Sequence, residues 1–184
     1  MKRFFDILCA ASALALLAPL LLAIALIVRI DSPGPVLYRQ TRVGLGGKTF
    51  SMYKFRSMVT NADRIGGYQT QQQDPRITTS GRWLRRTSLD ELPQLLNVLK
   101  GDMSVVGPRP DVPQQQSLYL RNDWTLRHSV RPGITGLAQA TLRSDATTEQ
   151  RLQLDLDYVG RHSLLFDLRI ILMTVRQLWT KGSY

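Results

Sequence analysis

The chain begins with a long apolar run. Residues Ile7 to Val28 carry no charged side chain, and only Ser12 and Pro19 interrupt the aliphatic pattern. As an α-helix these residues would extend about 33 Å, which is enough to cross the hydrocarbon core of a bilayer. A secretory signal peptide is the alternative, but the run is long for one and no small-residue cleavage site follows it. The pattern therefore predicts a membrane-embedded helix.

Two geometries of this helix are open at the level of sequence. Pro19 removes a backbone hydrogen bond in the middle of the run and bends the helix. Lys2 and Arg3 precede the run and Arg29 follows it, and positive side chains favour the cytoplasmic side of a membrane. A re-entrant helix, which enters and leaves on one face, places both basic flanks in the cytoplasm. A straight span with a tolerated proline kink places only one flank there.

The next part of the chain has the pattern of a β-hairpin. A turn-rich segment, Asp31 to Pro35, ends the apolar run. Short β-prone runs follow at residues 36–38 and 49–55, and the stretch between them is rich in glycine. Two such runs around a flexible tip predict a hairpin.

Helical patterns dominate the remainder, so we expect an α+β, mostly helical fold. The last helical segment places apolar residues on one side and Arg169 on another, which is amphipathic spacing. This helix either covers the core of the domain or lies in the membrane interface. The helical patterns cover residues 81–99, 112–128, 147–158 and 163–179.

The composition is strongly basic. Lys and Arg number 24 against 14 Asp and Glu, which gives a formal net charge of +10. A balance of this kind indicates an anionic partner: a nucleic acid, an anionic membrane or a phosphorylated substrate. The few aromatic residues do not interleave with the basic ones, which disfavours binding to single-stranded nucleic acid. Cys9 is the only cysteine, so no disulfide within the chain is expected.

A candidate for chemistry lies in residues 82–93, where three arginines precede two adjacent carboxylates, Asp90 and Glu91. One interpretation is structural, because Ser88 and Glu91 fit a helix capping box. The other is chemical. One carboxylate can form a covalent acyl phosphate, the other can help to hold Mg²⁺, and arginines can offset the charge of a diphosphate. The spacing alone fits both interpretations.

Four blocks of sequence together point to a known family. They are Ser32 to Gln40, Tyr53 to Met58, Arg82 to Pro110 and Arg131 to Gln139. In this order they resemble the bacterial sugar transferase family, the monotopic polyprenyl-phosphate phosphoglycosyl transferases, in their minimal form. The resemblance covers nearly the whole chain. One departure is Ala18-Pro19, where many relatives carry Ser-Pro, and it weakens the expectation of a re-entrant helix.

The resemblance implies roles for particular residues. Asp90 matches the nucleophile that forms a covalent phosphosugar intermediate, and Glu91 matches its acidic partner at Mg²⁺, to which both carboxylates would contribute. The charges of the other candidates could instead be solvated surface charges. These candidates are Lys54 near the site, Arg85 and Arg109 for phosphate groups, and Arg131 as a nucleotide contact.

The resemblance also implies an activity and a location. The expected reaction moves a sugar phosphate from a UDP-sugar to polyprenyl (undecaprenyl) phosphate, the first membrane step of a surface glycan pathway such as that of exopolysaccharide or O-antigen. Residues 1–30 would be a re-entrant helix in the bacterial inner membrane, and residues 31–184 a catalytic domain at its cytoplasmic face. A homodimer is left open. The alternative is a non-catalytic membrane scaffold of glycan assembly, for which Asp90 and Glu91 would be dispensable.

Overall fold

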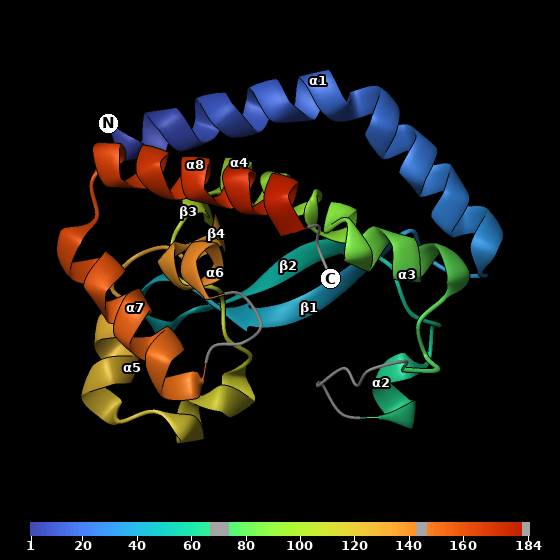
Figure 1. Cartoon of the computed structure of the whole chain (residues 1–184). Helices are drawn as coiled ribbons and strands as arrows, with labels where there is room; N and C mark the ends of the chain where they lie inside the picture. The colour runs from blue at the N-terminus through green and yellow to red at the C-terminus, as the bar shows by residue number, and fades with distance from the viewer. Residues whose placement is uncertain (67–73, 143–146, 182–184) are drawn as a thin grey trace.

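The computed structural model describes residues 1–66, 74–142 and 147–181. Helix α1 (Lys2–Asp31) runs along one side of the other elements and changes direction along its length, with Pro19 inside it (Figure 1). By length and composition this helix could cross a membrane. The long apolar helix predicted from the sequence is therefore present.

Both halves of α1 pack on the same body of protein. In the first half, Ala10 joins a buried cluster with Met52 of the hairpin. In the second half, Ile24 joins another cluster with Phe55 and Leu84. The two ends of the helix therefore lie against one domain, and neither end extends away from it.

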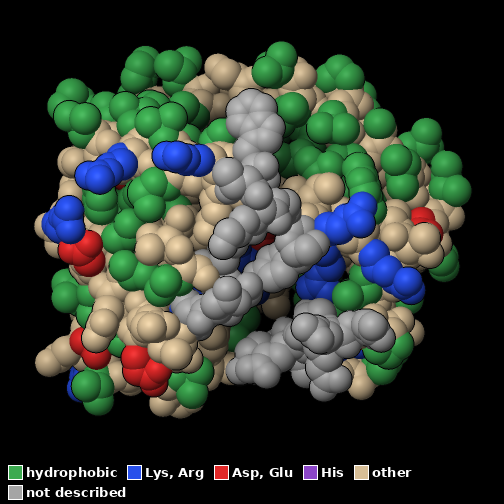
Figure 2. Space-filling model, in the orientation of Figure 1, with side chains coloured by type: hydrophobic (Ala, Val, Ile, Leu, Met, Phe, Trp, Pro, Cys, Tyr) green, Lys and Arg blue, Asp and Glu red, His purple; other side chains and the backbone are tan. Residues whose placement is uncertain are grey.

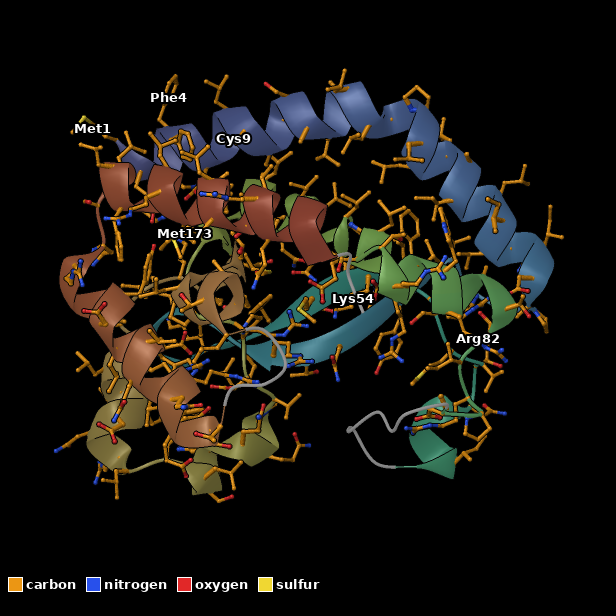
Figure 3. The ribbon with its side chains drawn as sticks, in the orientation of Figure 1. Met1, Phe4, Cys9, Lys54, Arg82 and Met173 are labelled. Atoms are coloured by element: carbon orange, nitrogen blue, oxygen red, sulfur yellow. The ribbon has the colours of Figure 1, made fainter. Side chains whose placement is uncertain are left out.

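The opposite side of α1 is apolar and exposed. Phe4 points away from the domain in Figure 3, and apolar side chains gather along the edge that α1 forms in Figure 2. Exposure of so long a row of aliphatic side chains to water is unfavourable, and such a surface typically contacts a membrane or a partner protein. The large apolar side chains exposed on this helix include Leu8, Leu16, Leu22, Leu26 and Ile30.

The predicted hairpin is confirmed. Strands β1 (Leu37–Val43) and β2 (Thr49–Phe55) pair antiparallel, and Tyr38 lies opposite Lys54. The reversal between them is a short 3-10 turn, η1 (Leu45–Gly47).

The single helix predicted over residues 81–99 is wrong. The structure has three short elements instead: α3 (Thr79–Arg86), the 3-10 turn η2 (Leu89–Glu91) and α4 (Gln94–Lys100). Ser88 breaks the helix because its backbone is left-handed, with φ of 56°. Its side chain makes no capping hydrogen bond, so the capping-box interpretation is wrong as well.

The helix predicted over residues 112–128 is also interrupted. It is divided into the 3-10 segment η3 (Pro113–Leu118) and α5 (Arg121–Arg127), because Tyr119 and Leu120 are extended. Earlier in the chain lies β3 (Ser104–Val106), the first strand of a small parallel sheet.

The second strand of this sheet is β4 (Gly133–Thr135). A Cβ on Gly133 would lie 2.1 Å from the backbone nitrogen of Gly107, so only glycine allows these two chain segments to approach so closely.

The two helices predicted over residues 147–158 and 163–179 are confirmed, and a short helix that was not predicted precedes them. The C-terminal half thus contains α6 (Leu137–Thr141), α7 (Thr148–Arg161) and α8 (Leu164–Lys181). Tyr158 and Ile170 from this half pack in a buried cluster with Val106. The short helix α2 (Ala62–Ile65) lies apart from these, on the other side of the hairpin (Figure 1).

Helix α8 presents a different character on each side. Ile170 and Asp167 are fully buried, so this side covers the core. The side chains of Leu165, Leu168 and Leu172 are exposed, and that of Leu172 is 70% exposed. Covering the core and lying in an interface are therefore not exclusive for this helix. The side chains of Leu178 and Trp179, which the sequence placed on the apolar side, lie outside the described part of the structure.

Candidate active site

An open cleft of about 760 Å³ lies between the hairpin, α2, α3 and η2. Among the described residues that line this cleft, Asp90 is acidic and seven residues are basic. A cleft of this charge is suited to a small ligand with several negative charges. The basic lining residues are Arg39, Arg42, Lys54, Arg56, Arg76, Arg85 and Arg109.

Asp90 lies in η2, directly after the left-handed Ser88. The turn places its carboxylate in the lining of the cleft, and the residue is only 6% exposed. Burial raises the pKa of Asp90, because a charged carboxylate loses hydration there. The charge of Glu91 acts in the same direction, while Lys54 and other basic neighbours oppose it. The result is a poorly hydrated carboxylate next to positive charge.

Glu91 is held by two cations. Nζ of Lys54 and Nη2 of Arg109 each donate to Oε1 of Glu91 at 2.7 Å. Burial alone would raise the pKa of Glu91, but Arg109 and Lys54 outweigh it and hold the pKa well below its usual range. The adjacent carboxylates Asp90 and Glu91 therefore have opposite pKa shifts, and Glu91 is kept as an anion.

Lys54 is not a solvated hairpin charge. Its side chain is only 15% exposed, and it joins β2 to η2 through Glu91. Burial lowers the pKa of Lys54, and the charge of Arg109 lowers it further, while Glu91 and Asp90 oppose the shift. Lys54 therefore links Glu91 to the hairpin, and its charge also acts on Asp90.

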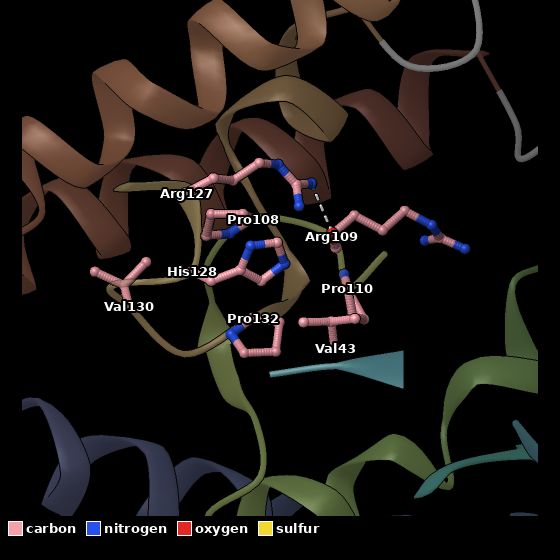
Figure 4. Close-up of a pocket in the computed structure, with 8 residues that line it drawn as sticks. All are labelled: Val43, Pro108, Arg109, Pro110, Arg127, His128, Val130 and Pro132. Atoms are coloured by element: carbon pink, nitrogen blue, oxygen red, sulfur yellow. Dashed lines mark hydrogen bonds between the residues drawn. The ribbon is translucent and has the colours of Figure 1, made fainter. Parts of the chain in front are cut away.

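Arg109 reaches the same cluster from the other side of the cleft. It follows β3, between Pro108 and Pro110, and its side chain extends away from the backbone in Figure 4. Besides the close contact with Oε1, its Nη1 donates to Oε2 of Glu91 at 3.5 Å. A planar guanidinium of this kind matches the geometry of carboxylate and phosphate groups.

The two remaining candidates from the sequence lie in different places. Arg85, on α3, lines the cleft with Asp90. Arg131 does not line it, and its Nε donates to the carbonyl oxygen of Gly101 at 2.9 Å. The structure therefore groups Lys54, Arg85 and Arg109 with the two carboxylates, and it leaves Arg131 outside this group.

Comparison with known proteins decides the family. The sequence profile described as bacterial sugar transferase matches residues 1–181 of the chain. The chain belongs to this family. The family expected from the four sequence blocks is thus confirmed.

Individual members of the family resemble the chain over nearly its whole length. Exopolysaccharide production protein PSS of Rhizobium leguminosarum is 50% identical, over 100% of this chain and 97% of that protein. UDP-glucose:undecaprenyl-phosphate glucose-1-phosphate transferase of Caulobacter vibrioides is 48% identical, over 99% of this chain and 71% of that protein. The protein of the same name from Escherichia coli is also 48% identical, over 95% of this chain and 39% of that protein.

Several basic residues of this sugar transferase's cleft were missed by sequence reasoning. Arg42 donates to Gln40 and to the carbonyl oxygen of Pro110. Burial and the charge of Arg109 lower the pKa of Arg42 to about 10. Alternation along the strand was a usable signal, because alternate residues of a strand share a face. In the structure Tyr38 lies opposite Lys54. By this alternation Gln40 and Arg42 follow Tyr38 on the same face of β1.

Arg56 has a different role at the edge of the cleft. Its guanidinium is buried, and Nη2 donates to the carbonyl oxygens of Val28 at 3.2 Å and of Ser32 at 2.6 Å. These are acceptors at the C-terminal end of α1, where a cation is favoured by the exposed carbonyl groups. Arg56 therefore fixes the end of α1 to the hairpin.

The carboxylates at the cleft are compatible with Mg²⁺, but they would supply only some of its ligands. In residues 1–66, 74–142 and 147–181, no three His, Cys, Asp or Glu side chains gather as a metal site. Mg²⁺ commonly uses one or two carboxylates and takes its other ligands from water and substrate phosphates. Asp90 and Glu91, side by side at a cationic cleft, fit this pattern.

Proposed function

We propose that this sugar transferase moves a sugar 1-phosphate from a UDP-sugar to undecaprenyl phosphate. Support comes from the relatives, whose names describe this transfer for glucose in Caulobacter vibrioides and for N-acetylgalactosamine in Aeromonas hydrophila. The chain is 48% and 42% identical to them, so these names leave the sugar open. Exopolysaccharide synthesis, named for the Rhizobium protein, is a fitting pathway.

The proposed chemistry has two steps at Asp90. In the first, an oxygen of the Asp90 carboxylate attacks the β-phosphorus of the UDP-sugar. The bond from this phosphorus to the bridging oxygen breaks, and UMP leaves with the electron pair. In the second, a phosphate oxygen of undecaprenyl phosphate attacks the same phosphorus, the bond to Asp90 breaks, and undecaprenyl-diphospho-sugar forms. Covalent catalysis of this kind divides one transfer into two displacements.

One observation carries this proposal: Asp90 is a buried carboxylate in the lining of a cleft whose other charged groups are mostly basic. A carboxylate that is poorly hydrated is a better nucleophile than one surrounded by water. Arg85 and Arg109 can offset the charge of the diphosphate as it approaches Asp90.

Glu91 supports the site in another way. Because Lys54 and Arg109 keep it ionised, it fixes both cations beside Asp90. When Mg²⁺ is bound, Asp90 and Glu91 would hold it together with phosphate oxygens, and the ion would offset negative charge on the transferring group. Removing Mg²⁺ with a chelator is then expected to stop turnover.

A position at the cytoplasmic face of the inner membrane follows from the same proposal. Both halves of α1 pack on the domain while its other side is apolar and exposed. This arrangement supports a re-entrant helix better than a straight span, which would carry one end away from the domain. The soluble donor and the lipid acceptor would then meet at the membrane surface.

Trapping of the intermediate tests the proposal. Purified protein is incubated with UDP-sugars labelled in the sugar, without undecaprenyl phosphate, and protein-bound label is counted after denaturation. Wild type should retain label and release UMP, and adding undecaprenyl phosphate should discharge the label. Asp90→Asn should retain none. Asp157→Asn, which changes an exposed carboxylate paired with Arg161 on α7, is the matched control and should behave as wild type.

The opposite outcome is equally clear. If Asp90→Asn turns over at the wild-type rate, the covalent mechanism is wrong. If wild type also releases no UMP from any UDP-sugar tested with the acceptor, a non-catalytic scaffold is the better description.

A further inference from the structure

The backbone of the segment that carries Arg109 is fixed through its carbonyl oxygens. Pro108 and Pro110 have no backbone N–H, so the segment has few donors of its own. Its four consecutive carbonyl oxygens, from Pro108 to Asp111, each accept a hydrogen bond from another part of the chain. The donors, in order, are the backbone nitrogen of Gly133 at 2.9 Å, Nη2 of Arg127 at 2.7 Å, Nη1 of Arg42 at 2.8 Å and the backbone nitrogen of Val43 at 2.9 Å.

Arg127 is the donor to Arg109 itself. In Figure 4 its side chain reaches the carbonyl oxygen of Arg109, while the side chain of Arg109 leaves in the other direction. Arg127 lies at the end of α5 and is 2% exposed. It thus contacts the backbone of Arg109 from the side opposite the cleft.

Two buried carboxylates hold the guanidinium of Arg127 in place. Nε donates to Oδ2 of Asp155 on α7 at 2.9 Å, and Nη1 donates to Oδ2 of Asp111. Burial would lower the pKa of Arg127, but Asp155 and Asp111 outweigh it and raise the pKa. The guanidinium is therefore a fixed cation whose third contact is the carbonyl oxygen of Arg109.

Such a network is an inefficient way to stabilise a fold. The cost of dehydrating buried charges usually equals or exceeds their attraction, and apolar side chains of similar volume often stabilise as well. What a planar guanidinium offers in addition is direction, because its donors are fixed relative to one another. The network therefore makes the backbone position of Arg109 depend on α5 and α7.

We propose that Arg127 is a positioning residue for sugar-phosphate transfer, acting only through Arg109. This inference rests on the proposed function. Arg127 holds the backbone of Arg109, so that the guanidinium of Arg109 meets both Glu91 and the diphosphate. A small displacement of such a group lowers the rate strongly, because the charge it must offset develops at a fixed point.

A double-mutant cycle tests the proposal. Arg127→Lys keeps the charge but cannot bridge two carboxylates and a carbonyl oxygen at once. Wild type, Arg127→Lys, Arg109→Ala and the double variant are assayed for UMP release with undecaprenyl phosphate, and each is checked by thermal unfolding. We expect Arg127→Lys to lower kcat/KM on the order of tenfold to a hundredfold. The decrease in kcat/KM caused by Arg127→Lys should come from KM and from kcat in the same proportion as the decrease caused by Arg109→Ala.

The cycle separates positioning from general support of the fold. If Arg127 acts through Arg109, then Arg127→Lys should have little further effect once Arg109 is alanine. An equal fold-loss in both backgrounds would overturn the proposal. If Arg127→Lys does not fold, Asp111→Asn replaces it in the cycle, because it weakens the contact between Asp111 and the guanidinium of Arg127. A small further effect in the Arg109→Ala background would again support the proposal, and an equal fold-loss in both backgrounds would again overturn it.

A further control addresses stability. Val98→Ala removes buried apolar volume from the cluster that α4 forms with Ala10 and Met52, which contains neither Arg127 nor its carboxylate partners, so it should lower the unfolding temperature with a smaller loss of rate than Arg127→Lys. An equal loss of rate at equal destabilisation would count against positioning. If wild type releases no UMP from any UDP-sugar, the proposed function itself fails and this inference fails with it. If wild type is active and the cycle is additive, only this inference fails.

Discussion

At the scale of single residues, the site depends on two neighbouring carboxylates with opposite environments. Asp90 is buried without a dominant cation, and its pKa is raised, whereas Glu91 is bound by Lys54 and Arg109 and its pKa is lowered. Adjacent residues in a short 3-10 turn point in different directions, which is how the two can differ so strongly. The difference is what the proposed mechanism requires, because it gives each carboxylate a separate role.

The raised pKa of Asp90 predicts the acid side of the pH profile. Only the ionised form can attack phosphorus, so the rate should fall on acidification at a pH above the range where exposed aspartates titrate, about 3.9. Lys54→Met removes a cation that favours ionised Asp90, so it should move this acid limb to still higher pH, besides lowering the rate. The measurement is kcat/KM for UMP release against pH.

Lys48→Met is the control for that profile. Lys48 lies exposed beside the hairpin tip, away from the cleft, so its loss should leave the acid limb where it is in wild type. An unchanged limb in Lys54→Met, or an equal shift in Lys48→Met, would contradict the assignment of the limb to Asp90.

At the scale of elements, the start of α1 is joined to the strand that leads to Arg109. Asp6 is buried and accepts hydrogen bonds from the hydroxyl of Ser104 at 2.9 Å and from the backbone nitrogen of Val105 at 3.0 Å. Nζ of Lys2 donates to the carbonyl oxygen of Val106 at 3.1 Å. The charged residues at the start of α1 thus serve as contacts to β3, besides flanking an apolar run.

Replacing Asp6 should therefore destabilise the domain. Asp6→Ala leaves the Ser104 hydroxyl and the Val105 N–H without their acceptor in a buried place, which should cost about 3 kcal/mol. The measurement is denaturant unfolding in detergent, followed by tryptophan fluorescence. Ser104→Ala should cost less, because the backbone contact of Asp6 remains. Unfolding of Asp6→Ala at the same denaturant concentration as Asp157→Ala, which changes an exposed side chain, would refute the role given to this contact.

The sequence predicted those elements whose pattern is local. The apolar run of α1, the hairpin and the amphipathic helix α8 can be recognised from periodicity alone. The break at Ser88 could not be, because a left-handed serine has no composition signal and its surroundings favour helix. Arg127 was not predicted for a related reason: its partners Asp111 and Asp155 lie 16 and 28 residues away, and only the tertiary fold brings them together.

At the scale of the whole molecule, the long apolar surface of α1 and the basic cleft belong to different elements. The exposed side of α1 is apolar, and α8 adds exposed leucines next to its exposed Arg169 and Arg176. Lys2 at the start of α1 forms an ion pair with Asp167 of α8. The basic cleft lies between the hairpin, α2, α3 and η2. Such a division is suited to an enzyme with one lipid and one water-soluble substrate.

This division predicts which side chains contact lipid. In a Cys9→Ala background, a fluorophore on Leu172→Cys should be quenched by brominated lipids in vesicles, because α8 would lie in the interface. The same fluorophore on Leu118→Cys should not be quenched. Leu118 is a matched control because it is 60% exposed, against 70% for Leu172, but it belongs to η3. Equal quenching at both positions would rule out an interfacial α8.

The attachment of α1 to the hairpin by Arg56 fixes the distance between the apolar helix and the cleft that Asp90 lines. Lys54 lies near the end of β2, and Arg56 follows it by two residues. The residue that holds the end of α1 and the cation beside Asp90 therefore lie almost next to each other in the chain. Under the proposed function, a long-chain acceptor would diffuse in the plane of the bilayer and would reach Asp90 at a constant depth. A prenyl phosphate too short to stay in the bilayer would have to find the same carboxylate by three-dimensional search, and it should be a poor acceptor even if its phosphate is identical.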